Sequence, residues 1–131
     1  MKSFQPYLNF NGNTREAMEF YQKACGGTLD LQTFGEASKV PGTEHRIMHA
    51  RLSNGDAVLM ASDTMPEHPF VQGTNVMVNI DCESDEELDR IFAALSEGAM
   101  ITMPVQDTFW RARFGMLIDK FGVHWMFNSQ H

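Results

Sequence analysis

The sequence predicts an α+β fold built from two tandem copies of one βαβββ module. Residues 13–25 and 84–96 repeat one helical pattern of apolar side chains, offset by 71 positions in a chain of 131 residues. A glycine follows each segment, and Gly27 and Gly98 are separated by the same 71 positions. One β-like run precedes each helix and three follow it, so the module order occurs twice.

Each predicted helix has a start signal, an apolar stripe and a stop signal. Asn13 and Ser84 precede Glu16 and Glu87 by three residues, which is the spacing of a capping box. The stripes follow the i, i+3, i+4, i+7 spacing of a core-facing helix. They comprise Ala17, Phe20, Tyr21 and Ala24 in the first helix, and Leu88, Ile91, Phe92 and Leu95 in the second. Both helices are therefore expected to bury the same face.

The β-like runs complete the two modules. In the first module they are residues 4–10, 28–34, 46–52 and 57–62, and in the second 76–82, 99–105, 112–118 and 124–128. Residues 53–56 and 119–122 have the composition of tight turns. We expect a single domain over residues 1–131, made of modules 1–62 and 75–131 that are joined by a linker over residues 63–74.

Composition excludes several classes of function. The net charge is −7 and no basic run occurs, so attraction to nucleic acid is not expected. No apolar stretch approaches the roughly 18 to 20 residues that cross a bilayer, so we expect a cytoplasmic protein without a membrane partner. Cys25 and Cys82 lack the spacing of a metal site and are expected to be thiols.

Local strings carry a resemblance to a known family. PYLNFNGN, EAMEFYQKACGG, VLMASD, TFW and RFGMLIDKFGVHWMFN resemble the PhnB-like branch of the vicinal-oxygen-chelate superfamily, which includes glyoxalase I, extradiol dioxygenases and bleomycin-resistance proteins. Some members of the branch have been labelled 3-demethylubiquinone methyltransferase, although the sequence lacks the Gly-rich strand–turn–helix of a nucleotide-type cofactor site. The resemblance implies curled sheets with the helices outside, a ligand pocket in the trough between modules, and a homodimer.

The resemblance also locates the four metal-ligand positions of the superfamily. They fall on Pro6, Met60, Asn75 and Met126, none of which is a customary ligand for a divalent cation. We therefore predict no metal and no other cofactor. If the alignment with the superfamily's ligand positions is shifted, the candidate ligands for a divalent metal are Gln5, His49, Asn75 and His124.

Strand alternation predicts which side chains line the trough. The predicted ligand pocket comprises Pro6, Met60, Asn75, Met77, Trp110, His124 and Met126. Methionines suit a pocket for irregular apolar ligands, but they would equally fill a core whose cavity has closed. Trp110 belongs to a loop that either closes over a ligand or anchors a dimer partner. His49 and Asp63 are the candidate acid–base pair.

Three functions remain open from the sequence. The first is a small-molecule binding protein of the glyoxalase/bleomycin-resistance type without the usual metal site. The second is a divalent-metal-dependent lyase or dioxygenase with non-standard ligands. The third is a dimeric module without catalytic activity, so whether the chain is an enzyme is left undecided.

Overall fold

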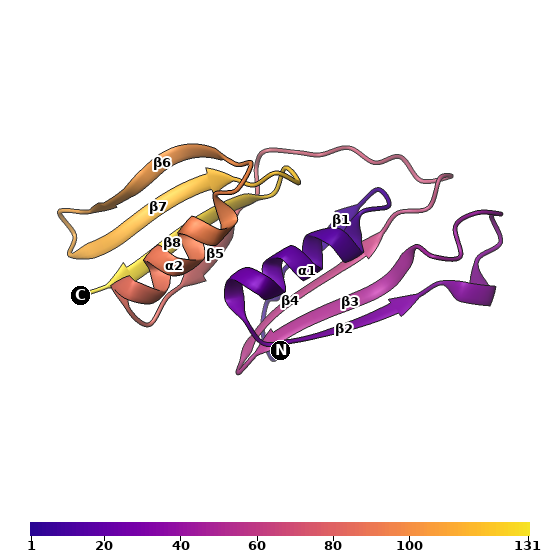
Figure 1. Cartoon of the computed structure of the whole chain (residues 1–131), viewed down its shortest axis with the longest axis horizontal. Coiled ribbons are helices and arrows are strands. Elements are labelled where there is room, and N and C mark those ends of the chain that lie inside the picture. The colour runs from indigo at the N-terminus through magenta and orange to yellow at the C-terminus, as the bar shows by residue number, and fades with distance from the viewer. The chain divides into compact units, whose positions relative to one another are not determined.

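Each half of the chain contains a strand, a helix and three further strands, in that order (Figure 1). The computed structural model describes all residues, 1–131, and it divides into two units, Met1–Val71 and Gln72–His131. The first unit contains β1 (Tyr7–Phe10), α1 (Thr14–Cys25), β2 (Thr28–Thr33), a short 3₁₀ helix (Gly35–Ala37), β3 (Ile47–Asn54) and β4 (Ala57–Asp63). The second contains β5 (Val78–Asp81), α2 (Asp85–Leu95), β6 (Met100–Asp107), β7 (Ala112–Ile118) and β8 (His124–Gln130).

The two sheets share one topology. Their strand orders are β1-β4-β3-β2 and β5-β8-β7-β6. In each sheet the first strand runs parallel to the last, and the other pairs are antiparallel. The predicted α+β class and the repeated module are confirmed.

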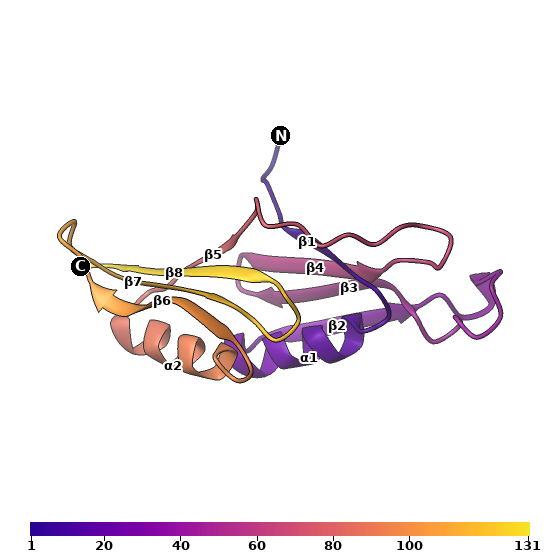
Figure 2. The same ribbon diagram turned by 90° about the horizontal axis from the view of Figure 1, so that it is seen from above.

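One helix packs on one face of each sheet (Figure 2). Along β4 the burial alternates, so Leu59 and Ala61 are buried on the α1 side while Met60 lies on the opposite face. Along β8 Trp125 and Phe127 are buried on the α2 side while Met126 lies on the opposite face. Because side chains alternate between the two faces along a strand, every second residue is in the core and the residues between them lie on the open face.

Close packing in the second unit requires a glycine on β7. A Cβ added at Gly115 would lie 3.0 Å from Cε2 of Phe92 and 3.0 Å from Cγ2 of Val105. Phe92 also makes an edge-to-face contact with Phe127, with ring centroids 5.1 Å apart. The glycine therefore lets α2 approach the sheet closely enough to bury these rings.

The two helices begin in different ways. At α2, Oγ of Ser84 accepts a hydrogen bond from N of Glu87 at 3.1 Å, as predicted. At α1, the Asn13 side chain makes no cap bond, so the predicted capping box is wrong there. The carboxylate of Asp63, from the end of β4, takes over that role.

Asp63 is buried and joins three segments of the first unit. Its Oδ1 accepts hydrogen bonds from N of Gly12 at 2.9 Å, from N of Thr14 at 3.1 Å and from Oγ1 of Thr14 at 2.7 Å. Its Oδ2 accepts one from N of Ile47 at 2.8 Å. Asp63 thus belongs to β4 and to the α1 cap, whereas the sequence pattern had placed it in the linker.

Burial of Thr14 shifts the apolar stripe of α1. The buried residues are Thr14, Ala17, Met18, Tyr21 and Ala24, whereas Phe20 is half-buried. Ala17, Tyr21 and Ala24 are thus buried as predicted, whereas Phe20 is not, and Thr14 and Met18 are buried in addition. The stripe of α2 is buried as predicted.

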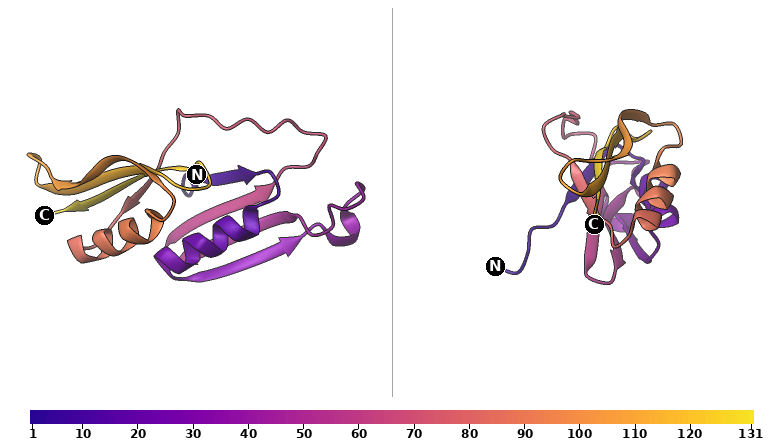
Figure 3. Two further views of the ribbon diagram at one scale, coloured as in Figure 1. Left: turned by 45° about the horizontal axis from the view of Figure 1, so that its top comes forward. Right: turned by 90° about the vertical axis from the view of Figure 1, so that its left-hand side faces the viewer.

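The segment between β4 and β5 has no helix or strand (Figure 3). It contains both Pro66 and Pro69, which lack the backbone N–H that a strand ladder needs. The chain has no helix with the length and apolar character that crossing a bilayer demands.

Replacing Asp63 with alanine is expected to destabilise the protein by about 3 kcal/mol, because three buried or partly buried amides would lose a charged acceptor. Urea unfolding of Asp63→Ala against the parent protein measures the change. Asp30→Ala, which removes an exposed carboxylate from β2, is the control and should shift the free energy of unfolding by less than about 0.5 kcal/mol. Equal losses in the two variants would show that Asp63 does not anchor α1.

Candidate functional site

On the sheet face opposite α1, Met60 lies between side chains from the two neighbouring strands. The strand register places Tyr7 and Arg51 on either side of Met60. Arg51 shares the face of Met60 because its neighbours Ala50 and Leu52 are buried on the α1 side. This face, defined by Tyr7, His49, Arg51 and Met60, is called the first open face.

Tyr7 and His49 meet above β4, the strand that separates β1 from β3. The distance from Oη of Tyr7 to Nδ1 of His49 is 3.1 Å, and the ring centroids lie 5.7 Å apart. A β-bulge precedes His49, since the pairing of β2 with β3 passes from His49 to Ile47 and skips Met48. Bulges re-aim side chains near binding sites. Beside this pair, Oγ of Ser62 donates to Oδ1 of Asn9 at 3.3 Å.

The structure does not bring His49 and Asp63 together. Asp63 is buried on the α1 side of β4, where its two oxygens already accept the hydrogen bonds of the helix cap and of Ile47. His49 lies on the opposite face and bonds to Tyr7. The acid–base candidates from the sequence therefore occupy two faces of one sheet.

The second unit has a more apolar face opposite α2. Met126 pairs with Met116, and His124, the first residue of β8, pairs with Ile118. All four side chains are half-buried. At the edge of this face, Nδ2 of Asn128 donates to Oδ1 of Asp81 at 3.1 Å.

Trp110 lies in the hairpin between β6 and β7. Its side chain is 50% exposed, and its ring makes edge-to-face contacts with Phe109 at 4.9 Å and with Phe114 at 6.1 Å. Phe109 is 93% exposed. Arg111 adopts a φ of 61°, a left-handed conformation that is uncommon outside glycine. The hairpin therefore displays two aromatic rings on a constrained turn.

The remaining predicted site residues lie outside the strands. Gln5 is exposed and Pro6 is half-buried just before β1, where O of Pro6 accepts a hydrogen bond from N of Met60 at 3.2 Å. Asn75 is exposed and Met77 is half-buried, both before β5. The strand expected over residues 4–10 begins only at Tyr7, and the register places Tyr7 instead of Pro6 beside Met60. Only the register of β1 with β4 identifies Tyr7 as the neighbour of Met60, and this register could not be read from the sequence.

The four side chains at the paired positions of the open faces do not fit the superfamily's divalent metal. The register pairs Tyr7 with Met60 in the first unit and Asn79 with Met126 in the second. These residues supply a phenol, two thioethers and an amide, whereas hard or borderline cations favour carboxylates and imidazoles. The four side chains therefore make a poor set of ligands for such a cation.

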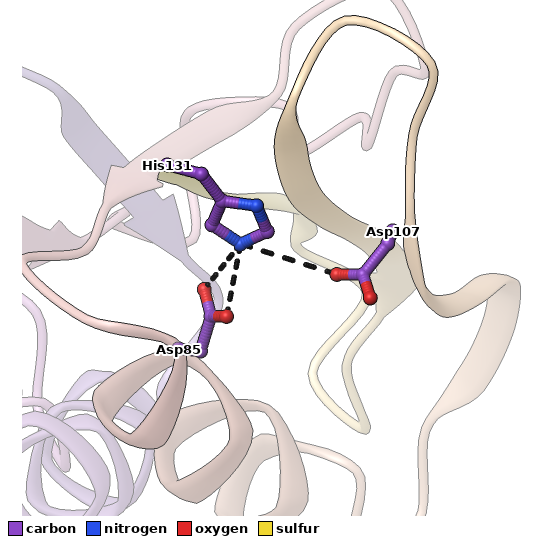
Figure 4. Close-up of side chains that lie close together, drawn as sticks. All are labelled: Asp85, Asp107 and His131. Atoms are coloured by element: carbon purple, nitrogen blue, oxygen red, sulfur yellow. Dashed lines mark hydrogen bonds and ion pairs between the residues drawn. The ribbon is translucent and has the colours of Figure 1, made fainter.

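A separate group of potential metal ligands lies in the second unit, away from the predicted positions. Asp85, Asp107 and His131 have ligand atoms within 4.8 Å of one another (Figure 4). Nε2 of His131 lies 2.9 Å from Oδ2 of Asp85 and 4.0 Å from Oδ1 of Asp107. No sequence spacing could reveal this group, because its members come from α2, β6 and the residue after β8.

Arg113 supplies a positive charge beside this group. Its Nε lies 2.8 Å from Oδ1 of Asp89, and its Nη1 lies 3.4 Å from Oδ1 of Asp107. The hydrogen bond to Asp89 raises the pKa of the Arg113 guanidinium, with burial opposing the shift. The guanidinium of Arg113 and the imidazole of His131 together contact the carboxylates of Asp85, Asp89 and Asp107.

Comparison with known proteins places the whole chain in one family. Residues 2–127 match the family described as 3-demethylubiquinone-9 3-methyltransferase. Protein YjdN of Escherichia coli (strain K12) is 34% identical over 136 residues, which cover 94% of this chain and 92% of YjdN.

Solved structures agree with this assignment. Protein PA1353 from Pseudomonas aeruginosa is 44% identical with a TM-score of 0.89, covering 98% of both chains. The PhnB protein from Bacillus cereus is 27% identical with a TM-score of 0.79, covering 98% of this chain and 99% of its own. A glyoxalase/bleomycin resistance protein/dioxygenase family enzyme from Burkholderia phytofirmans PsJN is 18% identical with a TM-score of 0.63, covering 95% and 97% of the two chains, and shares the fold. The chain belongs to the PhnB-like, 3-demethylubiquinone-9 3-methyltransferase family, which has the glyoxalase/bleomycin-resistance fold.

Proposed function

We propose that this protein binds a small organic molecule with an apolar body on its first open face, without the superfamily's usual metal site. The observation that carries the proposal is the position of Met60, half-buried between the Tyr7–His49 pair and Arg51. A flexible, polarizable thioether surrounded by hydrogen-bonding groups suits recognition of a ligand with an apolar centre and polar edges.

The face opposite α2 supports a related role. It adds Met116 and Met126 to the apolar surface of the chain, with His124 at the start of the same strand. Met77 and Trp110 remain proposed ligand contacts from the sequence, as do Pro6 and Asn75.

A cytoplasmic location also remains a proposal, supported by the thiols of Cys25 and Cys82.

Binding is tested with N-phenyl-1-naphthylamine, a neutral probe whose fluorescence rises in apolar surroundings. Met60→Gln keeps the length of the side chain and replaces the thioether by an amide, so the dissociation constant should rise about fivefold to tenfold. Small molecules that displace the probe would then identify the natural ligand class.

The control for this experiment is Met100→Gln, which makes the same change at an exposed position of the edge strand β6. It should leave probe affinity unchanged. Equal affinity in Met60→Gln and the parent protein would place the binding surface elsewhere. Circular dichroism melting of both variants separates loss of binding from loss of folding.

The alternative, a divalent-metal enzyme, is tested by elemental analysis of protein purified without chelator. Because Tyr7, Met60, Asn79 and Met126 make a poor set of ligands for hard and borderline cations, we expect less than about 0.1 ion per chain after soaking in zinc, nickel, manganese or iron. One ion per chain that disappears in His49→Ala or His124→Ala would support the metalloenzyme. An ion lost only in His131→Ala would instead belong to the Asp85, Asp107 and His131 group.

We also propose that the chain forms a homodimer through the hairpin tip that carries Phe109 and Trp110. Exposed aromatic side chains are enriched at protein interfaces, and the two rings already pack against each other at 4.9 Å.

Sedimentation velocity tests the dimer. The double variant Phe109→Ser, Trp110→Ser should raise the dimer dissociation constant at least about tenfold, since aromatic anchors commonly contribute 1–2 kcal/mol or more. Phe70→Ser changes another exposed phenylalanine, in the segment between β4 and β5, and should leave the dimer intact. A parent protein that sediments as a monomer would refute the proposal.

A further inference from the structure

We propose that the ligand of the first open face is an organic anion, with its apolar body on Met60 and its negative group on Arg51. This inference rests on the proposed function and specifies the ligand's charge. The juxtaposition of an arginine and a methionine on neighbouring strands carries it.

Arg51 is placed on the first open face by the sheet register. It is the Cα partner of Met60 on β4 and of Asp30 on β2. Its sequence neighbours Ala50 and Leu52 are buried on the other face, so its side chain lies on the face of Met60. The Arg51 side chain therefore leaves its strand next to Met60, on the face of the proposed site.

The guanidinium of Arg51 is available to a ligand. Arg51 is exposed, and its side chain makes no hydrogen bond or ion pair within the chain. This holds even though Asp30 is its direct partner on β2. Two other arginines differ in this respect, since Arg46 bonds to Asn11 and to the backbone oxygen of Thr64, and Arg113 bonds to Asp89.

Arg51 places a positive charge on the first open face of an acidic protein. The chain carries a net charge of −7, which disfavours the approach of anions in general. A local guanidinium offers five N–H donors in a planar fork, and these match the oxygens of a carboxylate, sulfonate or phosphate. An anionic group is therefore the ligand feature that Arg51 selects.

The Tyr7–His49 pair adds hydrogen-bonding groups to the same face. If the Tyr7 hydroxyl donates to Nδ1, the Nε2–H of His49 is left as a donor, whereas the opposite tautomer leaves the Tyr7 O–H as a donor. Either arrangement retains one outward donor, and neither side chain has another hydrogen bond within the chain. The pair therefore favours oxygen-rich groups on the ligand.

Two probes with the same apolar body test the inference. 8-Anilinonaphthalene-1-sulfonate carries a sulfonate that N-phenyl-1-naphthylamine lacks, so the ratio of their dissociation constants isolates the contribution of the negative charge. We expect Arg51→Gln to weaken binding of the sulfonate about tenfold, which corresponds to one charge-assisted interaction, and to leave the neutral probe unchanged. Added salt should weaken only the sulfonate, because exposed charge pairs are screened.

Arg15→Gln is the matched control, because Arg15 is an exposed arginine on α1. It should leave the ratio unchanged. An unchanged ratio in Arg51→Gln, or an equal change in Arg15→Gln, would overturn the anion site while leaving the proposed function intact. Failure of both probes to bind the parent protein would refute the proposed function and the anion site with it.

Discussion

A single helix covers only one face of each four-stranded sheet, and the remaining features of this protein depend on that constraint. Side chains alternate along a strand, so every strand contributes one set of residues to the helix side and another to the open face. On β4 the first set includes Leu59 and Ala61, and the second includes Met60. Core and candidate site are thus interleaved in sequence and separated in space.

The two modules have the same topology, but their helices are capped in different ways. Ser84 caps α2 with its own side chain, as a local capping sequence predicts. At α1 the capping oxygen comes from Asp63, which is 49 positions from Thr14 in the sequence. A buried carboxylate that accepts several hydrogen bonds couples the end of β4 to the helix and to β3. The same residue seemed suited to acid–base chemistry when only its sequence neighbours were known, and the structure gives it a role in folding.

The candidate site was partly visible in the sequence. The alternation of VLMASD and HWMFN correctly separates Met60 and Met126 from the buried positions, because period-two burial is a local property of a strand. The contact of Tyr7 with His49 was not predictable in this way. It requires β4 to lie between β1 and β3, and it requires both side chains to lean across that strand. Likewise, Asp85, Asp107 and His131 converge from separate elements, so no spacing rule could have grouped them.

The sequence by itself determined the repeated βαβββ order, the two helices, most strand boundaries and the family resemblance. These features arise from periodicity, turn residues and local strings, which act over a few positions. Tertiary structure alone decided that Asp63 would cap α1, that His49 would pair with Tyr7, and that Arg51 would stand beside Met60 without an ion pair. These outcomes depend on strand order and register, which bring distant residues together by hydrogen bonding between strands and leave no mark in the spacing of any one segment.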